Sequence, residues 1–188
     1  YDDTAGVHGR EDSLAQSYLL GSDFDLAPYA SAFGGNGWKP IGNYDASYYG
    51  AGLTGRHIFT GTLMGRTGGS TLSNLSLTPT AGADRWVGYV ALVGRARNAT
   101  LSDLNLQNVT VAPHPSDSLG ALYAGGFTAY SSLGTFRNLN ASQIAMTFPN
   151  FGSGTKFVLA GALAGDFATG TADNIRATNI SLNGPGVA

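Results

Sequence analysis

Short apolar stretches separated by Gly, Ser, Asn and Thr recur through the second half of the chain. Four segments align without gaps, at residues 63–77, 92–106, 127–141 and 163–177. In each segment a small residue lies seven positions before an apolar residue, and a second apolar residue follows three positions later. A repeat of this length, made of short apolar strands and polar turns, is typical of a solenoid.

Each repeat holds three short stretches in which apolar and polar residues alternate. The clearest examples of the three are residues 90–94, 101–106 and 109–111. Alternation sends every second side chain into a core, and the abundance of glycine and β-branched residues excludes helical solenoids. The pattern predicts an all-β fold, a right-handed parallel β-helix of about four to five coils.

One polar position recurs just before the second apolar residue of each repeat. Its occupants are Asn74, Asp103, Asn138 and Asn174. Asparagine side chains stacked in successive coils can each donate to one neighbour and accept from the next. We therefore expect these residues to form a structural ladder, in which Asp103 either faces solvent or accepts from backbone amides.

The first third of the chain is less regular. Residues 1–17 are polar and are predicted to be a lead-in or cap segment, and residues 18–27 alternate well enough to form a first strand. Residues 28–58 are predicted to project as an irregular aromatic loop from a β-helix that spans residues 18–183, and residues 184–188 form a tail.

Composition narrows the classes of function. Charged residues are 12% of the chain, 28 residues are glycine, none is cysteine, and the net charge is −2. Ten scattered cations form no basic face, so nucleic acid is not expected as a partner. No apolar run approaches the length of a membrane-spanning helix, so no membrane insertion is expected either. This composition favours a protein that is extracellular or attached to the cell surface.

Metal binding and catalysis find little support in the sequence. Asp23 and Asp25 lie two positions apart on one strand face and could form half of a calcium site, although a solvent-facing pair is the simpler interpretation. His8, His57 and His114 lack a second ligand at metal spacing. The acidic residues of the regular coils occupy different repeat positions, unlike the clustered carboxylates of polysaccharide-cleaving enzymes. We expect no catalytic residue and no cofactor.

Aromatic residues gather in the irregular loop. They are the candidate ligand-binding residues Tyr29, Phe33, Trp38, Tyr44, Tyr48 and Tyr49. Such rings can stack on sugars or anchor a protein, and the alternative is that they pack the loop onto the β-helix. Asn-x-Ser/Thr sequons also mark four candidate glycosylation sites, Asn98, Asn108, Asn140 and Asn179.

Two groups of motifs resemble the GLUG-repeat proteins of bacterial surfaces. The stretches at 18–27, 38–42 and 59–63 (YLLGSDFDLA, WKPIG and FTGTL) are similar to the block that precedes those repeats. ALVG at 91–94 and ALAG at 162–165, each followed by a strand with an Asn or Asp beside its apolar residues, are similar to the repeats. The family includes adhesins, two-partner-secreted exoproteins and parts of immunoglobulin A metallopeptidases. The resemblance implies a right-handed β-helix without catalytic residues.

Two functions follow as expectations. The first is a non-enzymatic extracellular β-helix segment of a bacterial surface adhesin or fibre, a stiff scaffold that presents loops to a glycan or protein. The second is a self-assembling structural subunit that polymerises head to tail into an extracellular filament, because open strand edges recruit further strands.

Overall fold

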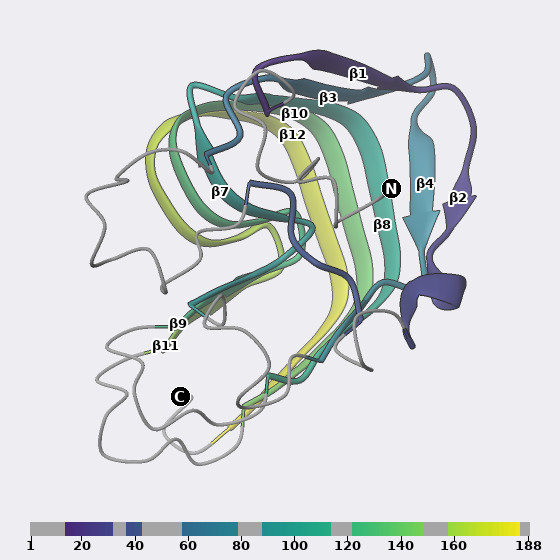
Figure 1. Cartoon of the computed structure of the whole chain (residues 1–188), viewed down its shortest axis with the longest axis vertical. Coiled ribbons are helices and arrows are strands. Elements are labelled where there is room, and N and C mark those ends of the chain that lie inside the picture. Colours follow the sequence, from purple (N-terminus) through teal and green to yellow (C-terminus); the bar gives the residue numbers. More distant parts are fainter. Residues whose placement is uncertain are drawn as a thin grey trace.

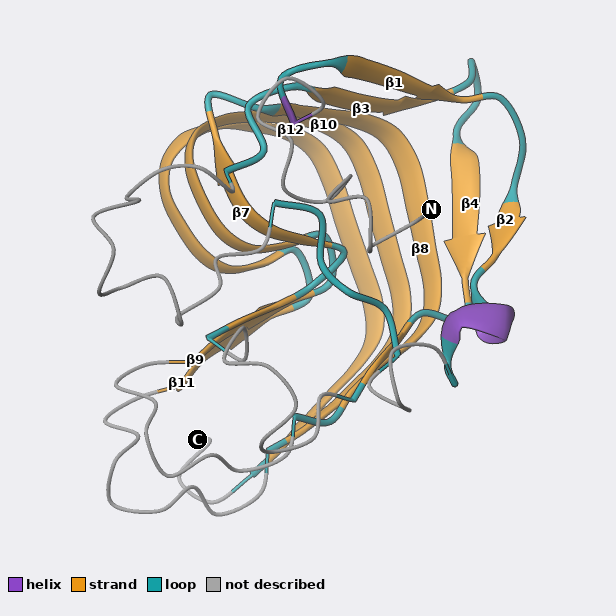
Figure 2. Cartoon of the chain, viewed as in Figure 1, coloured by secondary structure: helices purple, strands orange, loops and turns teal. Residues whose placement is uncertain are grey.

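The structure is a computed structural model that describes residues 14–31, 37–42, 58–78, 88–113, 122–148 and 158–184. This part of the chain is all-β, with a short 3-10 helix at Ala27–Tyr29 (Figure 2). The strands are β1 (Ser17–Leu20), β2 (Phe24–Asp25), β3 (Thr62–Gly65), β4 (Ser70–Ser73), β5 (Ser76–Leu77), β6 (Tyr89–Val90), β7 (Val93–Arg97), β8 (Thr100–Val111), β9 (Leu122–Gly125), β10 (Thr128–Thr147), β11 (Val158–Gly161) and β12 (Ala164–Asn183).

The strands form two sheets in which the strand pairs are parallel. The larger sheet follows the order β1-β3-β8-β10-β12, with β2, β4, β5 and β7 at its sides, and the smaller sheet follows β11-β9-β6. Figure 1 shows β8, β10 and β12 as nested arcs along one path. We call each passage along this path a pass: β1–β2, β3–β6, β7–β9, β10–β11 and β12. The arrangement is compatible with the predicted β-helix.

Strand register agrees with three of the four aligned repeats. Leu139 pairs with Leu104 on one side and with Ile175 on the other, as the alignment requires. The first repeat was aligned wrongly, because Leu72 pairs with Leu106 and not with Leu101. The residues between β3 and β4 form an additional turn, closed by a hydrogen bond from the Gly69 N–H to the Arg66 carbonyl at 2.8 Å. This turn shifts the register of the later second-pass residues against β8 by four positions.

Residues with a left-handed backbone bend the long strands at regular corners. They recur every five residues, and the residue after each one is buried or partly buried. They are Asn98, Asp103 and Asn108 in the third pass, Leu133, Asn138 and Gln143 in the fourth, Asn174 and Asn179 in the fifth, and Asn74 in the second. Asn and Asp tolerate this conformation better than most residues. Three separate strands per repeat were expected, but β10 runs through its corners as one strand of 20 residues.

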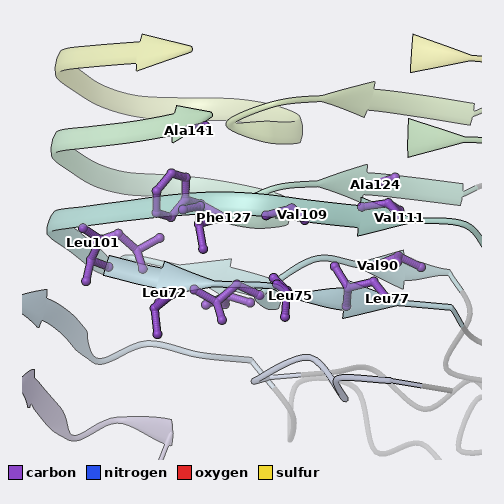
Figure 3. Close-up of a cluster of buried hydrophobic side chains, with 14 of the residues drawn as sticks. Leu72, Leu75, Leu77, Val90, Leu101, Val109, Val111, Ala124, Phe127 and Ala141 are labelled. Carbon is purple, nitrogen blue, oxygen red and sulfur yellow. The ribbon is translucent and has the colours of Figure 1, made fainter. Parts of the chain in front are cut away.

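Inward side chains of successive passes stack in ranks and form one core (Figure 3). One rank holds Leu72, Leu106 and Ala141, and all three are at most 5% exposed. Another holds Leu77, Val111 and Met146, which have no exposed surface. Full burial of a leucine or valine stabilises the fold by about 1.5–3 kcal/mol, so these ranks supply the main stabilisation.

Trp38 covers the N-terminal end of the core. Its backbone N–H donates to the Ser76 carbonyl at 2.7 Å, and its indole Nε1 donates to the Leu92 carbonyl at 3.1 Å. Ile41 forms a parallel bridge to Val93 at the edge of β7. Residues 37–42, predicted to belong to a projecting loop, therefore lie against the second and third passes. They take this position because the short first pass leaves those edges without a strand partner.

Leu133 occupies a corner that suits its side chain poorly. Its φ is 56°, a conformation that costs a non-glycine residue about 1–2 kcal/mol, and its side chain is 53% exposed. The same corner one pass earlier holds Asn98, with φ 55°. We expect Leu133→Asn to raise the free energy of unfolding by about 0.5–1 kcal/mol, measured by urea denaturation. Leu159→Asn, at an exposed strand position, is the control and should bring no gain.

Candidate functional site

A column of hydrogen-bonded side chains runs along the corner that contains Asp103. Asn138 Nδ2 donates to Asp103 Oδ1, and Asn174 Nδ2 donates to Asn138 Oδ1, both at 2.8 Å. We call these three residues the first column. Asp103 accepts a side-chain amide, which differs from the solvent or backbone partners considered from the sequence. Each amide donates toward the preceding pass, so the column has a direction.

A second column runs along the next corner. Asn108 Nδ2 donates to Asn74 Oδ1 at 2.6 Å, and Asn74 Nδ2 donates to Asp25 Oδ1 at 2.8 Å. Asn74 was predicted to share a ladder with Asp103, and this assignment is corrected by the turn inserted after β3. Asp25, Asn74 and Asn108 form the second column, which has the same donor direction as the first.

Each column starts at an aspartate. An ionised carboxylate only accepts hydrogen bonds, whereas an amide both donates and accepts. Asp25 and Asp103 therefore accept from the first amide of their columns. Because a carboxylate has no N–H group, neither aspartate needs an acceptor in the pass before it. The register of β4 on β8 places Gly69 of the second pass beside Asp103. Gly69 has φ 94° and no side chain, so the first column does not extend into the second pass.

The two aspartates considered for calcium have different partners. Both Asp23 carboxylate oxygens accept from Arg66 Nη2 at 3.0 Å, and Oδ1 also accepts from the Thr71 N–H at 2.8 Å. The Arg66 and Asp23 side chains are 47% and 56% exposed, so their pairing contributes little to stability. Within the described ranges, no three His, Cys, Asp or Glu residues gather as metal ligands.

The ionisation of Asp25 makes the stability contributed by the second column depend on pH. Hydrogen bonds from Asn74 Nδ2 and the Ala27 N–H hold the pKa of Asp25 below its ordinary value of 3.8. A lowered folded-state pKa stabilises the fold above the unfolded-state value, and this stabilisation is lost as pH falls through the folded-state pKa. We expect Asp25→Asn to lose less stability than wild type below about pH 4 in urea denaturation. Asp173→Asn controls for removing one surface carboxylate, and equal acid sensitivity of wild type and Asp25→Asn would contradict this expectation.

The structure describes two of the aromatic candidates. Tyr29 is 42% exposed, and its ring meets Trp38 edge to face with centroids 5.8 Å apart. Trp38 is partly buried against the core, which is the packing alternative considered for these residues. Phe33, Tyr44, Tyr48 and Tyr49 lie outside the described residues. Tyr29 is thus the described member of this group with substantial exposed ring surface.

A second aromatic group lies where the chain turns from the smaller sheet into the larger one. Tyr89 and Tyr123 stack with centroids 5.2 Å apart and an interplanar angle of 8°, and Tyr130 meets Tyr123 edge to face at 5.7 Å. The Arg95 guanidinium lies 5.8 Å from the centre of the Tyr130 ring. We call these four residues the tyrosine row. The row was not predicted from the sequence, although Tyr89 and Tyr123 are 34 residues apart and each precedes a small apolar residue.

Three of the candidate glycosylation sites are corner residues: Asn98, Asn108 and Asn179 have φ values of 55–56°. A glycan is attached through the amide nitrogen. At Asn108 this atom donates to Asn74, so a glycan there would compete with the second column. Asn140 lies between corners and has a buried Oδ1 without a partner.

The described side chains thus provide two directional amide columns and the partly exposed tyrosine row. No helix in the described ranges is long and apolar enough to cross a membrane. Comparison with known proteins adds no relative: no family model, no curated protein and no solved structure matches the chain.

Proposed function

We propose that the chain is a right-handed parallel β-helix that serves as a stiff, non-enzymatic segment of an extracellular bacterial adhesin or fibre. The observation that carries this proposal is the in-register parallel stacking of the passes around one core. The GLUG-like motifs give additional support for the bacterial surface. In such a scaffold, each pass needs only its neighbours to bury its apolar side chains.

The scaffold would present aromatic side chains to a glycan or protein. Tyr29 offers exposed ring surface near the N-terminal end. The tyrosine row combines three rings with a guanidinium, which is chemistry suited to sugar or protein contacts. Because the two groups lie on different parts of the fold, single substitutions can separate their contributions.

Head-to-tail polymerisation is the alternative function. It is favoured by the half-exposed apolar residues of the fifth pass, among them Ile175 and Ile180. The N-terminal end opposes it, since Trp38 covers the core there and Asp25 can accept but not donate. We therefore rank the discrete scaffold above the filament.

Sedimentation over a wide concentration range, with negative-stain electron microscopy of the same samples, separates the two functions. A discrete species at every concentration would support the scaffold, and long uniform filaments would establish the alternative. Glycan-array binding of the wild type then tests ligand presentation against Tyr29→Ala and Tyr130→Ala. Tyr18→Ala, an exposed tyrosine on β1, is the control. Absence of binding to glycans and to candidate host proteins would remove the ligand-presenting role.

A further inference from the structure

Two stacked tyrosines lie in register on the smaller sheet. Tyr89 in β6 pairs with Tyr123 in β9, and the next residue along this rank is Leu159 in β11. The two rings are nearly parallel, with an interplanar angle of 8° and centroids 5.2 Å apart. Because the rings are parallel, equivalent carbon atoms of the two rings are separated by about the centroid distance. Among the described residues, this rank therefore contains one tyrosine pair.

The tyrosines of this region are accessible to solvent. Tyr89, Tyr123 and Tyr130 are each partly exposed. A phenol that loses one electron also releases its proton, and water can accept that proton at a partly exposed ring. The unpaired electron of the resulting radical is shared between the oxygen and the two neighbouring ring carbons, Cε1 and Cε2. Two such radicals couple through these carbons when their rings lie close together.

Arg95 favours oxidation of the stacked pair over oxidation of Tyr130. Its guanidinium lies 5.8 Å from the centre of the Tyr130 ring, and Tyr130 meets Tyr123 edge to face at 5.7 Å. The guanidinium is permanently charged, and a positive charge beside a ring opposes the removal of an electron from that ring. Stacking has the opposite effect, because a missing electron is shared by the rings of Tyr89 and Tyr123.

We infer that Tyr89 and Tyr123 form an oxidative cross-linking site, at which a peroxidase-type one-electron oxidant joins one Cε atom of each ring as dityrosine. Each phenol loses one electron and one proton, and coupling of the two radicals forms one carbon–carbon bond. The hydrogens on the coupled carbons then move to the phenolic oxygens. One hydrogen peroxide takes up the two electrons and two protons and becomes two waters. This chemistry depends on the ring geometry and does not require the proposed extracellular role.

The new bond would fasten the second pass to the third. β6 has only two residues, and its partner in the smaller sheet is β9. The coupled tyrosines are 34 residues apart, so the bond closes a long loop of chain. A cross-link of this kind stabilises a fold mainly by restricting the unfolded chain. Oxidation would therefore reinforce the place where the smaller sheet has its shortest described strand.

The test treats the full chain, at low concentration, with hydrogen peroxide and a haem peroxidase, and then isolates the monomer. Intact mass reports the loss of two hydrogens, and tandem mass spectrometry of tryptic peptides locates the bond. Tyr89→Phe and Tyr123→Phe each keep a ring in the stack and remove one phenol. Tyr130→Phe and Tyr18→Phe are the matched controls, because they remove phenols outside the pair.

We expect wild type and both control variants to yield a cross-linked monomer, with the bond between residues 89 and 123. Tyr89→Phe or Tyr123→Phe should lower the yield of this monomer at least about tenfold, because coupling between neighbours in the fold is intramolecular. The cross-linked wild type should unfold at a higher urea concentration than the untreated protein. Equal yields from all variants, a bond between other tyrosines, or dityrosine found only in dimers would overturn the inference.

Discussion

Phe136→Ala should cost about 3–5 kcal/mol of unfolding free energy, the largest effect expected from a single side-chain truncation in this chain. Phe136 has no exposed surface, and it lies in register between Leu101 and Ala172. Its ring also packs against Phe167, with centroids 5.1 Å apart. Truncation leaves a cavity in the middle of the stacked passes, where neighbours on both sides limit collapse. Urea denaturation of wild type and variant provides the measurement.

Phe167→Ala is the matched control, because it removes the same ring from the last pass. Phe167 is only partly buried, so its truncation opens less cavity and should cost about 1–2 kcal/mol. Equal costs at the two positions would show that the fifth pass is packed as tightly as the fourth, contrary to the structure.

Asn138→Asp should destabilise the fold by about 2 kcal/mol at pH 7, after allowance for solvent screening. Asn138 donates to Asp103 at 2.8 Å, and the substitution replaces this bond with two facing carboxylates. Their repulsion raises the pKa of the pair above the unfolded-state values. The loss is therefore present at neutral pH and is relieved as pH falls through the raised pKa, when one carboxyl becomes a donor. Urea midpoints at about pH 7 and pH 3.5 measure both parts.

Asn138→Gly separates charge from the lost hydrogen bonds. Glycine keeps the left-handed backbone, so this variant loses both side-chain bonds without strain and should cost about 1 kcal/mol. Its cost should be similar at the two pH values. If Asn138→Asp behaved the same way, the first column would not carry the donor direction assigned to it.

The sequence predicted the stacking of the last three passes because their equivalent residues keep constant spacing. Leu104, Leu139 and Ile175 are related by 35 and 36 residues, and the structure pairs them as expected. The second pass escaped correct alignment because its extra turn precedes Leu72. An alignment without gaps cannot accommodate such a turn, so it matches Leu72 with the wrong leucine. The backbone pairing of Leu72 with Leu106 shows the correct match.

The five-residue spacing of corners was visible in the sequence but was not recognised. Asp103 and Asn108, like Asn138 and Gln143, are each followed by a buried apolar residue. Alternating patterns were interpreted as separate strands, since composition alone does not reveal a left-handed residue inside a continuous strand. Asp25 was also beyond sequence reasoning, because its place at the start of the second column depends on pairing with a residue 49 positions away.

The stacked passes determine how the chain would respond to tension. Among the described strands, β12 pairs with β10, so force that separates these two strands would detach the fifth pass from the fourth as one unit. Thr128 and its register partner Ala164 are 36 residues apart, so each detached pass adds about 120 Å of extended chain. A tether built this way lengthens in similar small increments and absorbs work at each one, instead of failing in a single rupture.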